Sequence, residues 1–210
     1  MQRIRISYDK GRELQYTGNL DMHKVWERTF RRAQLPLAYS QGFHPQPKIQ
    51  QAAPLPLGFT SKAEILDVWM DTDDPADSIA KTLVKTAQPG ITIRNVVVIP
   101  LTEDALPNQV TAALYTVTLD EPLDINDLNQ KIANLLSLHT IERERRGKKY
   151  DLRPLIQEFS LGDENPVELH LKLTSLPGAT GRPEEVLEEL WIDPFSVDIE
   201  RTSLVLVKTK

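Results

Sequence analysis

The stretch Arg3-Ile4-Arg5-Ile6-Ser7-Tyr8 decides the fold class, because its side chains alternate between apolar and polar with a period of two residues. This alternation predicts a β-strand with one buried face. Between Leu20 and Ala33 the period becomes that of a helix, whose apolar side is formed by Met22, Trp26, Thr29 and Ala33. A strand followed by an amphipathic helix predicts a mixed α and β chain.

Further along the chain the same order of elements occurs twice. The first half is expected to contain strands at 3–8, 48–52, 63–70 and 91–99, with helices at 20–33 and 75–88. The second half is expected to contain strands at 113–119, 140–146, 167–174 and 196–207, with helices at 125–138 and 183–191. This order predicts an α+β fold of two tandem ferredoxin-like βαββαβ halves with antiparallel sheets. The expected domains are 1–100 and 111–210, joined by a linker at 101–110.

The composition excludes several classes of protein. Of the 210 residues, 40% are hydrophobic and 26% are charged, which is ordinary for a globular protein. No stretch approaches the roughly 18 apolar residues of a membrane span, and the N-terminus enters a strand directly, so we expect a cytoplasmic protein with no membrane contact. The sequence has no cysteine, which excludes disulfides, thiolate zinc sites and protein-held iron–sulfur clusters.

The net charge of −5 conceals a basic segment near the N-terminus, where residues 1–50 carry nine Lys or Arg against four Asp or Glu. Lys24, Arg28 and Arg31 fall at positions i, i+4 and i+7, so they share a helix face, and Arg32 adjoins it. Arg3 and Arg5 are expected to project from the open side of the sheet. Such a surface suits the phosphates of RNA. The alternative is a solvated helix face with no ligand.

A second basic segment lies at 141–153, around Gly147. A hairpin there would present Arg145, Lys148 and Arg153 to one anionic ligand, since Arg suits bidentate contact with phosphate or carboxylate. The alternative is a charged hairpin that only aids solubility. Arg182, which precedes a short helix, is a further candidate that could reach the same ligand.

The segment Ser40–Lys48 reads Ser-Gln-Gly-Phe-His-Pro-Gln-Pro-Lys and is the most specific motif in the chain. Gly42 permits backbone angles that other residues avoid, and two prolines restrict the loop. We expect a rigid binding loop that displays Gln41, His44 and Lys48. The alternative is a structural turn whose Phe43 fills the core.

Several motifs together resemble those of the radical-SAM-linked protein family, a bacterial domain of unknown function found beside or fused to radical S-adenosylmethionine proteins. The motifs are Leu35-Pro36-Leu37-Ala38-Tyr39-Ser40-Gln41-Gly42-Phe43-His44-Pro45, Pro54-Leu55-Pro56-Leu57-Gly58, Asp151-Leu152-Arg153-Pro154 and Gly181-Arg182-Pro183-Glu184. The resemblance spans nearly the whole chain and implies a radical S-adenosylmethionine protein as partner. It does not imply radical chemistry in this chain, which lacks the cysteines that hold the cluster.

These observations favour a non-catalytic module that binds RNA or presents a substrate, with no cofactor and no metal. Its binding residues would converge on a cleft between the halves. Aromatic residues make up 6% of the chain and no strand carries the ribonucleoprotein aromatic pattern, so phosphate and shape recognition would dominate. Two alternatives remain: a protein-interaction adaptor that uses the same loop, and a metal-independent nuclease that uses His23 or His44.

Overall fold

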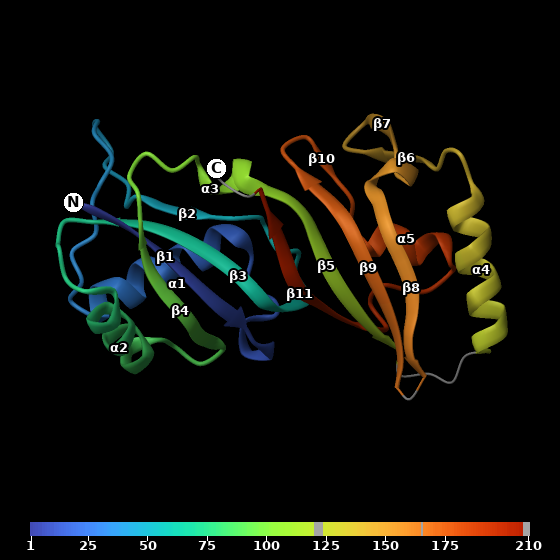
Figure 1. Ribbon diagram of the computed structural model, residues 1–210, viewed down its shortest axis with the longest axis horizontal. Coiled ribbons are helices and arrows are strands. Elements are labelled where there is room, and N and C mark those ends of the chain that lie inside the picture. The colour runs from blue at the N-terminus through green and yellow to red at the C-terminus, as the bar shows by residue number, and fades with distance from the viewer. Residues whose placement is uncertain (120–123, 165, 208–210) are drawn as a thin grey trace. The chain divides into compact units, whose positions relative to one another are not determined.

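The computed structural model describes residues 1–119, 124–164 and 166–207, and it shows an α+β protein (Figure 1). The chain divides into two compact units, residues 1–109 and residues 110–210, called unit 1 and unit 2. Within the described residues, no helix combines the length and the apolar character that a membrane span requires.

Unit 1 has the element order strand, helix, strand, strand, helix, strand. Its elements are β1 (Gln2–Lys10), a 3-10 turn η1 (Arg12–Leu14), α1 (Asn19–Arg32), β2 (Ile49–Gln51), β3 (Phe59–Met70), α2 (Ala76–Thr86), β4 (Ile91–Ile99) and the short α3 (Leu106–Gln109). The strands lie in the order β2-β3-β1-β4, and each pair is antiparallel. The predicted elements of this half are therefore all present.

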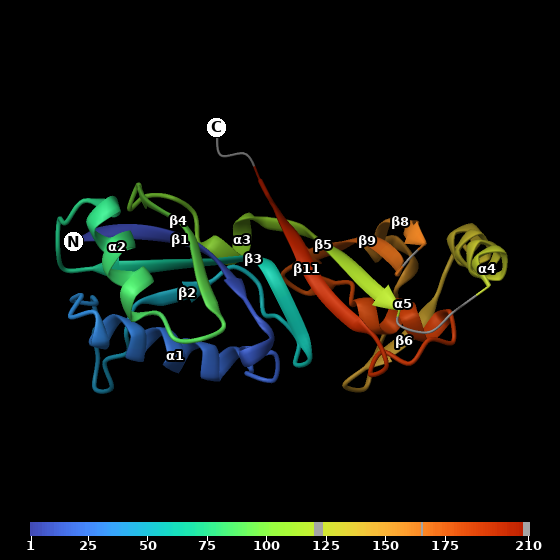
Figure 2. The ribbon, with the colours of Figure 1, turned by 90° about the horizontal axis from the view of Figure 1, so that it is seen from below.

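One face of the unit 1 sheet carries the core. Ile4, Ile6 and Tyr8 alternate along β1 and are buried, as their period of two requires. The helix α1 lies along this face (Figure 2) and buries Trp26, whose ring meets that of Tyr8 edge-on at 4.8 Å between centroids. Helix α2 adds Ile79 and Leu83 to the same cluster. The helix face opposite to Trp26 is thereby left toward solvent.

The other face of this sheet differs from the prediction, because Arg3 and Arg5 do not project freely. Asp67 lies directly opposite Arg5 in the ladder, and its carboxylate accepts from Arg5 Nε at 2.8 Å and from Arg3 Nη2 at 2.6 Å. Arg3 is 1% exposed and also donates to the carbonyl oxygen of Asp104 at 2.8 Å. A buried carboxylate 62 and 64 residues away in sequence thus neutralises two cations that the strand pattern leaves open.

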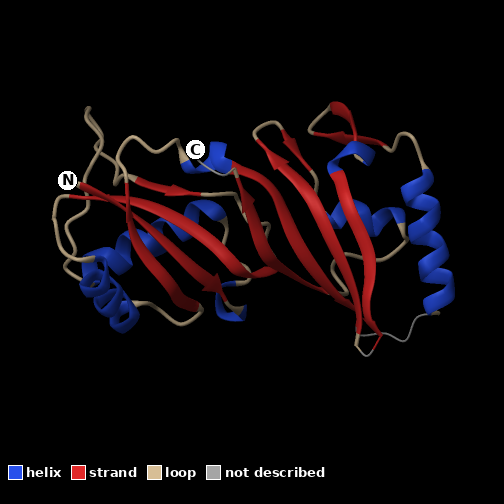
Figure 3. Cartoon of the chain, in the orientation of Figure 1, coloured by secondary structure: helices blue, strands red, loops and turns tan. Residues whose placement is uncertain are grey.

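Unit 2 also contains paired antiparallel strands. Its elements are β5 (Val110–Leu119), α4 (Ile125–Ser137), β6 (Glu142–Arg145), β7 (Lys148–Asp151), a 3-10 turn η2 (Arg153–Leu155), β8 (Ile156–Glu164), β9 (Val167–Leu176), β10 (Ala179–Thr180), α5 (Pro183–Glu189) and β11 (Asp198–Leu206). Strand β9 pairs with β5, which pairs in turn with β11, and β8 and β10 also pair with β9 (Figure 3).

The predicted strand at 140–146 is wrong as a member of this sheet. Residues 142–145 pair instead with β7, in a separate two-stranded hairpin. Strand β8 takes the expected place beside β9 and buries Ile156 and Phe159. The reason is physical: the run Glu-Arg-Glu-Arg has no apolar face to bury. The hairpin closes through Arg146 and Gly147, which both have positive φ (52° and 76°), as a tight two-residue turn requires.

Candidate nucleic-acid interface

The predicted binding residues divide between the two units. Unit 1 contains Lys24, Arg28, Arg31, Arg32, Gln41, His44 and Lys48. Unit 2 contains Arg145, Lys148, Arg153 and Arg182. The surroundings of these two sets differ strongly.

The solvent face of α1 is basic, as its spacing predicts. Met22, Trp26, Thr29 and Phe30 are buried, so Lys24, Arg28 and Arg31 are exposed on the other side. Lys24 Nζ contacts one carboxylate, Asp21 Oδ1, at 3.4 Å, and both groups are more than half exposed. Among the described residues, Arg28 and Arg31 have no carboxylate within ion-pair distance. The three cations span about 10 Å of helix, at 1.5 Å per residue.

Arg32 belongs less clearly to this face. Its Nη1 donates to the carbonyl oxygen of Thr86 at 2.9 Å, at the C-terminal end of α2. The side chain remains exposed, and an Arg near the last carbonyl groups of a helix is also electrostatically favourable. Arg32 therefore joins the two helices, and the basic face consists of Lys24, Arg28 and Arg31.

The loop after α1 has a fixed base and an exposed tip. At the base, the backbone N–H of Lys48 donates to the carbonyl oxygen of Ala38, and that of Ser40 donates to Gln46, both at 2.8 Å. Residues 41–46 are all exposed, and Gly42 has φ 136°, which favours glycine. The loop thus displays Gln41 and His44, whereas Lys48 is half-buried at the base.

Phe43 lies at this tip and is fully exposed, at 103% of the reference area. The alternative in which Phe43 fills the core is therefore wrong. A phenyl ring displayed in this way can stack on an unpaired base or enter a protein pocket.

Two arginines of the hairpin in unit 2 are paired with α5. Arg145 Nη2 donates to both carboxylate oxygens of Glu185 at 2.7 Å, and its guanidinium lies 4.9 Å from the ring centroid of Tyr150. Burial, assisted by Glu185, raises the pKa of Tyr150 above its ordinary value. Arg143 pairs with Glu188 and, at 2.9 Å, with Glu189. The two arginines hold the hairpin against the helix.

Arg153 also has a structural role. Its Nη2 donates to the carbonyl oxygen of Leu136 at 2.9 Å, and its Nη1 donates to that of Ile156 at 3.2 Å. It therefore joins the end of α4 to the start of β8. Lys148 is exposed and lines a hollow of about 400 Å³ together with Arg145, Lys149 and Tyr150. Lys148 is thus available to a ligand, and so is the exposed Arg182.

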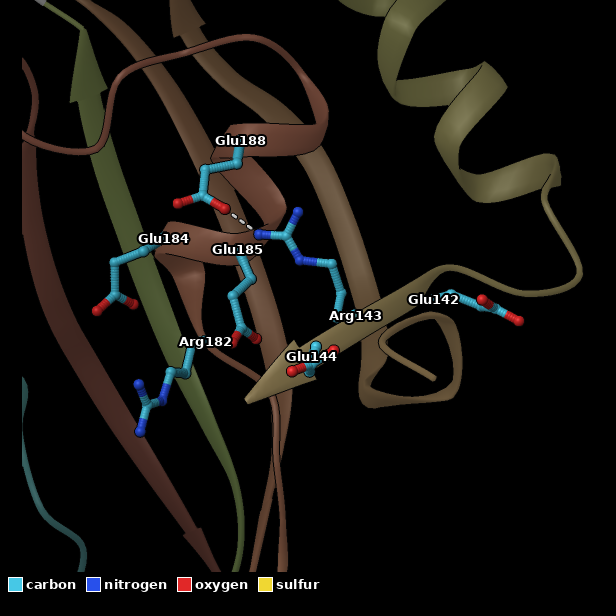
Figure 4. A pocket seen from close by; sticks show the side chains of 7 residues that line it. All are labelled: Glu142, Arg143, Glu144, Arg182, Glu184, Glu185 and Glu188. Carbon is cyan, nitrogen blue, oxygen red and sulfur yellow. Dashed lines mark hydrogen bonds and ion pairs between the residues drawn. The ribbon is translucent and has the colours of Figure 1, made fainter. Parts of the chain in front are cut away.

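Arg182 lies in a second hollow, of about 440 Å³, beside the hairpin (Figure 4). Figure 4 shows Arg143 and Glu188 pointing toward one another, with Arg182 apart from this pair. Five glutamates and two arginines line the space: Glu142, Glu144, Glu184, Glu185, Glu188, Arg143 and Arg182. Burial raises the pKa of Glu184 above its ordinary value, and Glu184 Oε2 is buried without a hydrogen-bond partner among the described residues. An excess of carboxylates does not suit a phosphate.

Sequence reasoning missed an apolar patch at the start of α1, formed by Tyr16, Leu20 and Leu57. These side chains are 79%, 79% and 61% exposed. The side chain of Leu57 lies close to Gly18, because its Cδ2 would be 3.7 Å from a Cβ at that position. The ring of Tyr16 lies close to Gly58 in the same way, at 3.9 Å. Leu20 precedes Lys24 and Arg28 at four-residue intervals, so the helical spacing could have placed it on the basic face.

Histidines offer no metal centre in the part of the chain that the structure describes, where no three His, Cys, Asp or Glu residues are placed to hold a metal ion. Within the same residues, the side chains of His23 and His44 make no hydrogen bond. A general base is usually oriented by a third group. Neither histidine has such a group among the residues that the structure describes.

The structure thus shows an α+β protein that has an exposed basic helix and a projecting loop. The chain belongs to a family of uncharacterized proteins conserved in bacteria (DUF2344), whose model matches residues 3–183. A crystal structure of an unknown protein from Galdieria sulphuraria is similar over 98% of this chain and 99% of its own, with 14% identity and a TM-score of 0.29. Similarity at this TM-score carries no argument about fold or function. No curated protein matches the chain.

Proposed function

We propose that this chain is a non-catalytic, cytoplasmic RNA-binding module that contacts RNA phosphates through Lys24, Arg28 and Arg31. The observation that supports this proposal is the exposure of three cations on one helix face, two of which have no carboxylate within ion-pair distance among the described residues. Binding a phosphate there breaks no strong ion pair and displaces only counterions. Exposed Phe43 supplies one ring on which an unpaired base can stack.

The sheet of unit 1 is not expected to be the stacking platform. Its open face contains the buried Arg3, Arg5 and Asp67 cluster, and Arg3 lies 4.7 Å over the ring of Trp69. An aromatic ring covered in this way does not offer a face to a base. Recognition therefore rests on phosphates and shape.

The test is the salt dependence of binding to a fluorescein-labelled, 12-nucleotide single-stranded RNA. Three phosphate contacts predict that affinity falls about twentyfold between 50 and 200 mM salt, on a slope of about 0.7 per contact. Changing Arg28 and Arg31 to Ala leaves one contact, so the fall should shrink to about threefold.

The matched control removes two exposed lysines from α2, Lys81→Ala with Lys85→Ala, and is expected to keep the full slope. The proposal is refuted if the RNA does not bind at 50 mM salt, or if the arginine variant and the lysine variant behave alike.

A second candidate function is a protein-interaction adaptor, which the exposed apolar side chains favour. Phe43 and the patch of Tyr16, Leu20 and Leu57 offer contact area that a nucleic acid does not need. The resemblance noted above makes a radical S-adenosylmethionine protein the proposed partner. An apolar contact survives about 0.5 M salt, because screening at that ionic strength removes surface attraction and not burial. Changing Phe43 to Ser should abolish it.

For the fold, we propose that the units are tandem ferredoxin-like βαββαβ domains. The strand order β2-β3-β1-β4 of unit 1 and the order β8-β9-β5-β11 of unit 2 support this, since each is 2-3-1-4 in chain order. The hairpin β6–β7 is then an insertion between the first helix and the second strand of unit 2.

A further inference from the structure

The connection between α5 and β11 displays two aromatic side chains in solvent. Trp191 is 90% exposed and Phe195 is 96% exposed. Each could remove 150–250 Å² from water on burial. Scattered apolar residues on a surface are normal. Trp191 and Phe195, by contrast, lie within five residues of each other and are both almost fully exposed.

The backbone of Trp191 has a conformation that is unfavourable for tryptophan and that glycine would adopt more easily. Its φ is +63°, in the left-handed region that glycine adopts without penalty. The N–H of Ile192 donates to the carbonyl oxygen of Leu187 at 3.0 Å, so Trp191 occupies the position after a helix end where glycine is preferred. Because the side chain of Trp191 is almost fully exposed, its burial within the chain does not offset this strain.

The connection is also held in shape. Asp193 Oδ1 accepts from the backbone N–H of Phe195 at 3.0 Å, and the carbonyl oxygen of Asp193 accepts from the N–H of Ser196 at 3.1 Å. Pro194 restricts the backbone between them. An ordered display loses little entropy on binding.

Charge identifies the class of partner. Residues 183–200 carry seven Asp or Glu and no Lys or Arg, and the pairing of Arg143 and Arg145 with Glu185, Glu188 and Glu189 still leaves carboxylates in excess. Such a surface repels the phosphates of nucleic acid and the headgroups of anionic lipids. It attracts a surface that carries Lys and Arg, and aromatic anchors at protein interfaces enter apolar pockets.

From these observations we infer that Trp191 and Phe195 are the anchors of a docking site for a second protein, one that presents an apolar pocket rimmed by Lys and Arg. This site consists of residues of unit 2, whereas the basic face of α1 belongs to unit 1, so the inference goes beyond the proposed RNA binding.

The test begins with a photo-reactive benzoylphenylalanine at position 195 of the full chain, in the bacterium that encodes it. The expected product is one discrete protein, crosslinked at an apolar residue with Lys or Arg nearby. The same probe at Leu138, which is 47% exposed in unit 2, is the control and should not give this product.

The crosslinked protein is then purified, and its affinity is measured by calorimetry. Trp191→Gly with Phe195→Ser should weaken binding at least about tenfold, as hot-spot aromatic residues do. Leu138→Ser should not change it. Glycine suits the backbone at position 191, so the melting temperature should be unchanged or higher, and RNA binding should equal that of the parent.

Crosslinks only to RNA, to lipid or to a second copy of the chain would overturn the inference. So would the absence of any crosslink, or an affinity that the double variant leaves intact. Loss of RNA binding in the α1 variant concerns the proposed function alone and does not bear on this site.

Discussion

The basic face of α1 and the hairpin β6–β7 carry similar cations in very different surroundings. On α1, Arg28 and Arg31 face solvent with no carboxylate in range among the described residues. On the hairpin, Arg143 and Arg145 are about three-quarters buried and paired with glutamates of α5. The cations of the first region can pair with phosphates and so release the counterions condensed on a nucleic acid. The second must first break an existing ion pair.

The difference teaches that a count of charges along a segment does not measure the charge available to a ligand. Breaking a half-buried pair leaves a carboxylate desolvated, which costs more than the phosphate contact returns. We therefore propose that the hairpin arginines contribute to stability and that the helix arginines contribute to RNA binding. Four experiments can break or sharpen this assignment.

The largest effect is expected at the third set of cations, Arg3 and Arg5. Changing Asp67 to Ala leaves the buried Arg3 and the partly buried Arg5 without their carboxylate, so unit 1 should lose about 3–5 kcal/mol of stability. Amide hydrogen exchange in β1 and β3 measures this loss. Asp73→Ala, at a 92% exposed side chain, should stay within about 0.5 kcal/mol. Equal losses in the two variants would contradict the structural role.

A smaller loss is expected in unit 2. Changing Arg145 to Ala leaves Glu185, which is 14% exposed, without its bidentate partner, and should cost about 1–3 kcal/mol. Urea unfolding followed by circular dichroism measures it. The same substitution at Arg28 should change stability by less than about 0.5 kcal/mol. If Arg28→Ala destabilises the chain as much as Arg145→Ala does, the proposed difference between the two regions is wrong.

For the affinity for RNA, we expect the helix arginines to have a larger effect than the hairpin arginines. At about 150 mM salt, the Arg28→Ala and Arg31→Ala double variant should bind the 12-nucleotide RNA about tenfold more weakly, as expected for two lost contacts. Arg143→Ala should leave the affinity within about twofold, because that guanidinium already serves Glu188 and Glu189. Equal losses would mean that the hairpin also meets phosphate.

The smallest effect concerns pH and Glu184. Burial raises the pKa of Glu184 in the folded chain, so its contribution to stability is present below its unfolded pKa and is lost as pH rises through the folded value. Glu184→Gln should therefore raise the melting temperature at pH 7, and the gain should shrink at pH 4. Glu142→Gln, at an exposed residue of the same hollow, should show no such trend. A pH-independent gain would assign the effect to packing.

Regular periodicity allowed much of the fold to be predicted. The alternation in β1 and the helical spacing of Trp26 in α1 each match the buried residues. Strand β8 was missed because its ladder to β9 shifts register between Ile156 and Glu158, which interrupts the alternation that would reveal it. The run Glu142–Arg145 alternates only in charge, so it predicted a strand without indicating which sheet it joins.

For the candidate site, the sequence predicted which helix face is basic and could not predict which cations are already paired. Glu185 lies 40 residues after Arg145, and Asp67 lies 64 residues after Arg3. Pairings over such separations depend on tertiary structure. The exposure of Phe43 could not be predicted either, since an aromatic residue near glycine and proline is found both in turns packed against the core and at the tips of exposed loops.

The three tryptophans have a spectroscopic consequence. Trp26 is wholly buried in unit 1, Trp69 lies beneath the Arg3 guanidinium, and Trp191 stands in solvent in unit 2. An indole ring that moves from the core into water shifts its emission to longer wavelength, whereas a ring already in water does not. The intrinsic fluorescence of the parent chain should therefore report the melting of residues 1–109 almost alone, and a change in the long-wavelength component of the folded chain should report contact at Trp191.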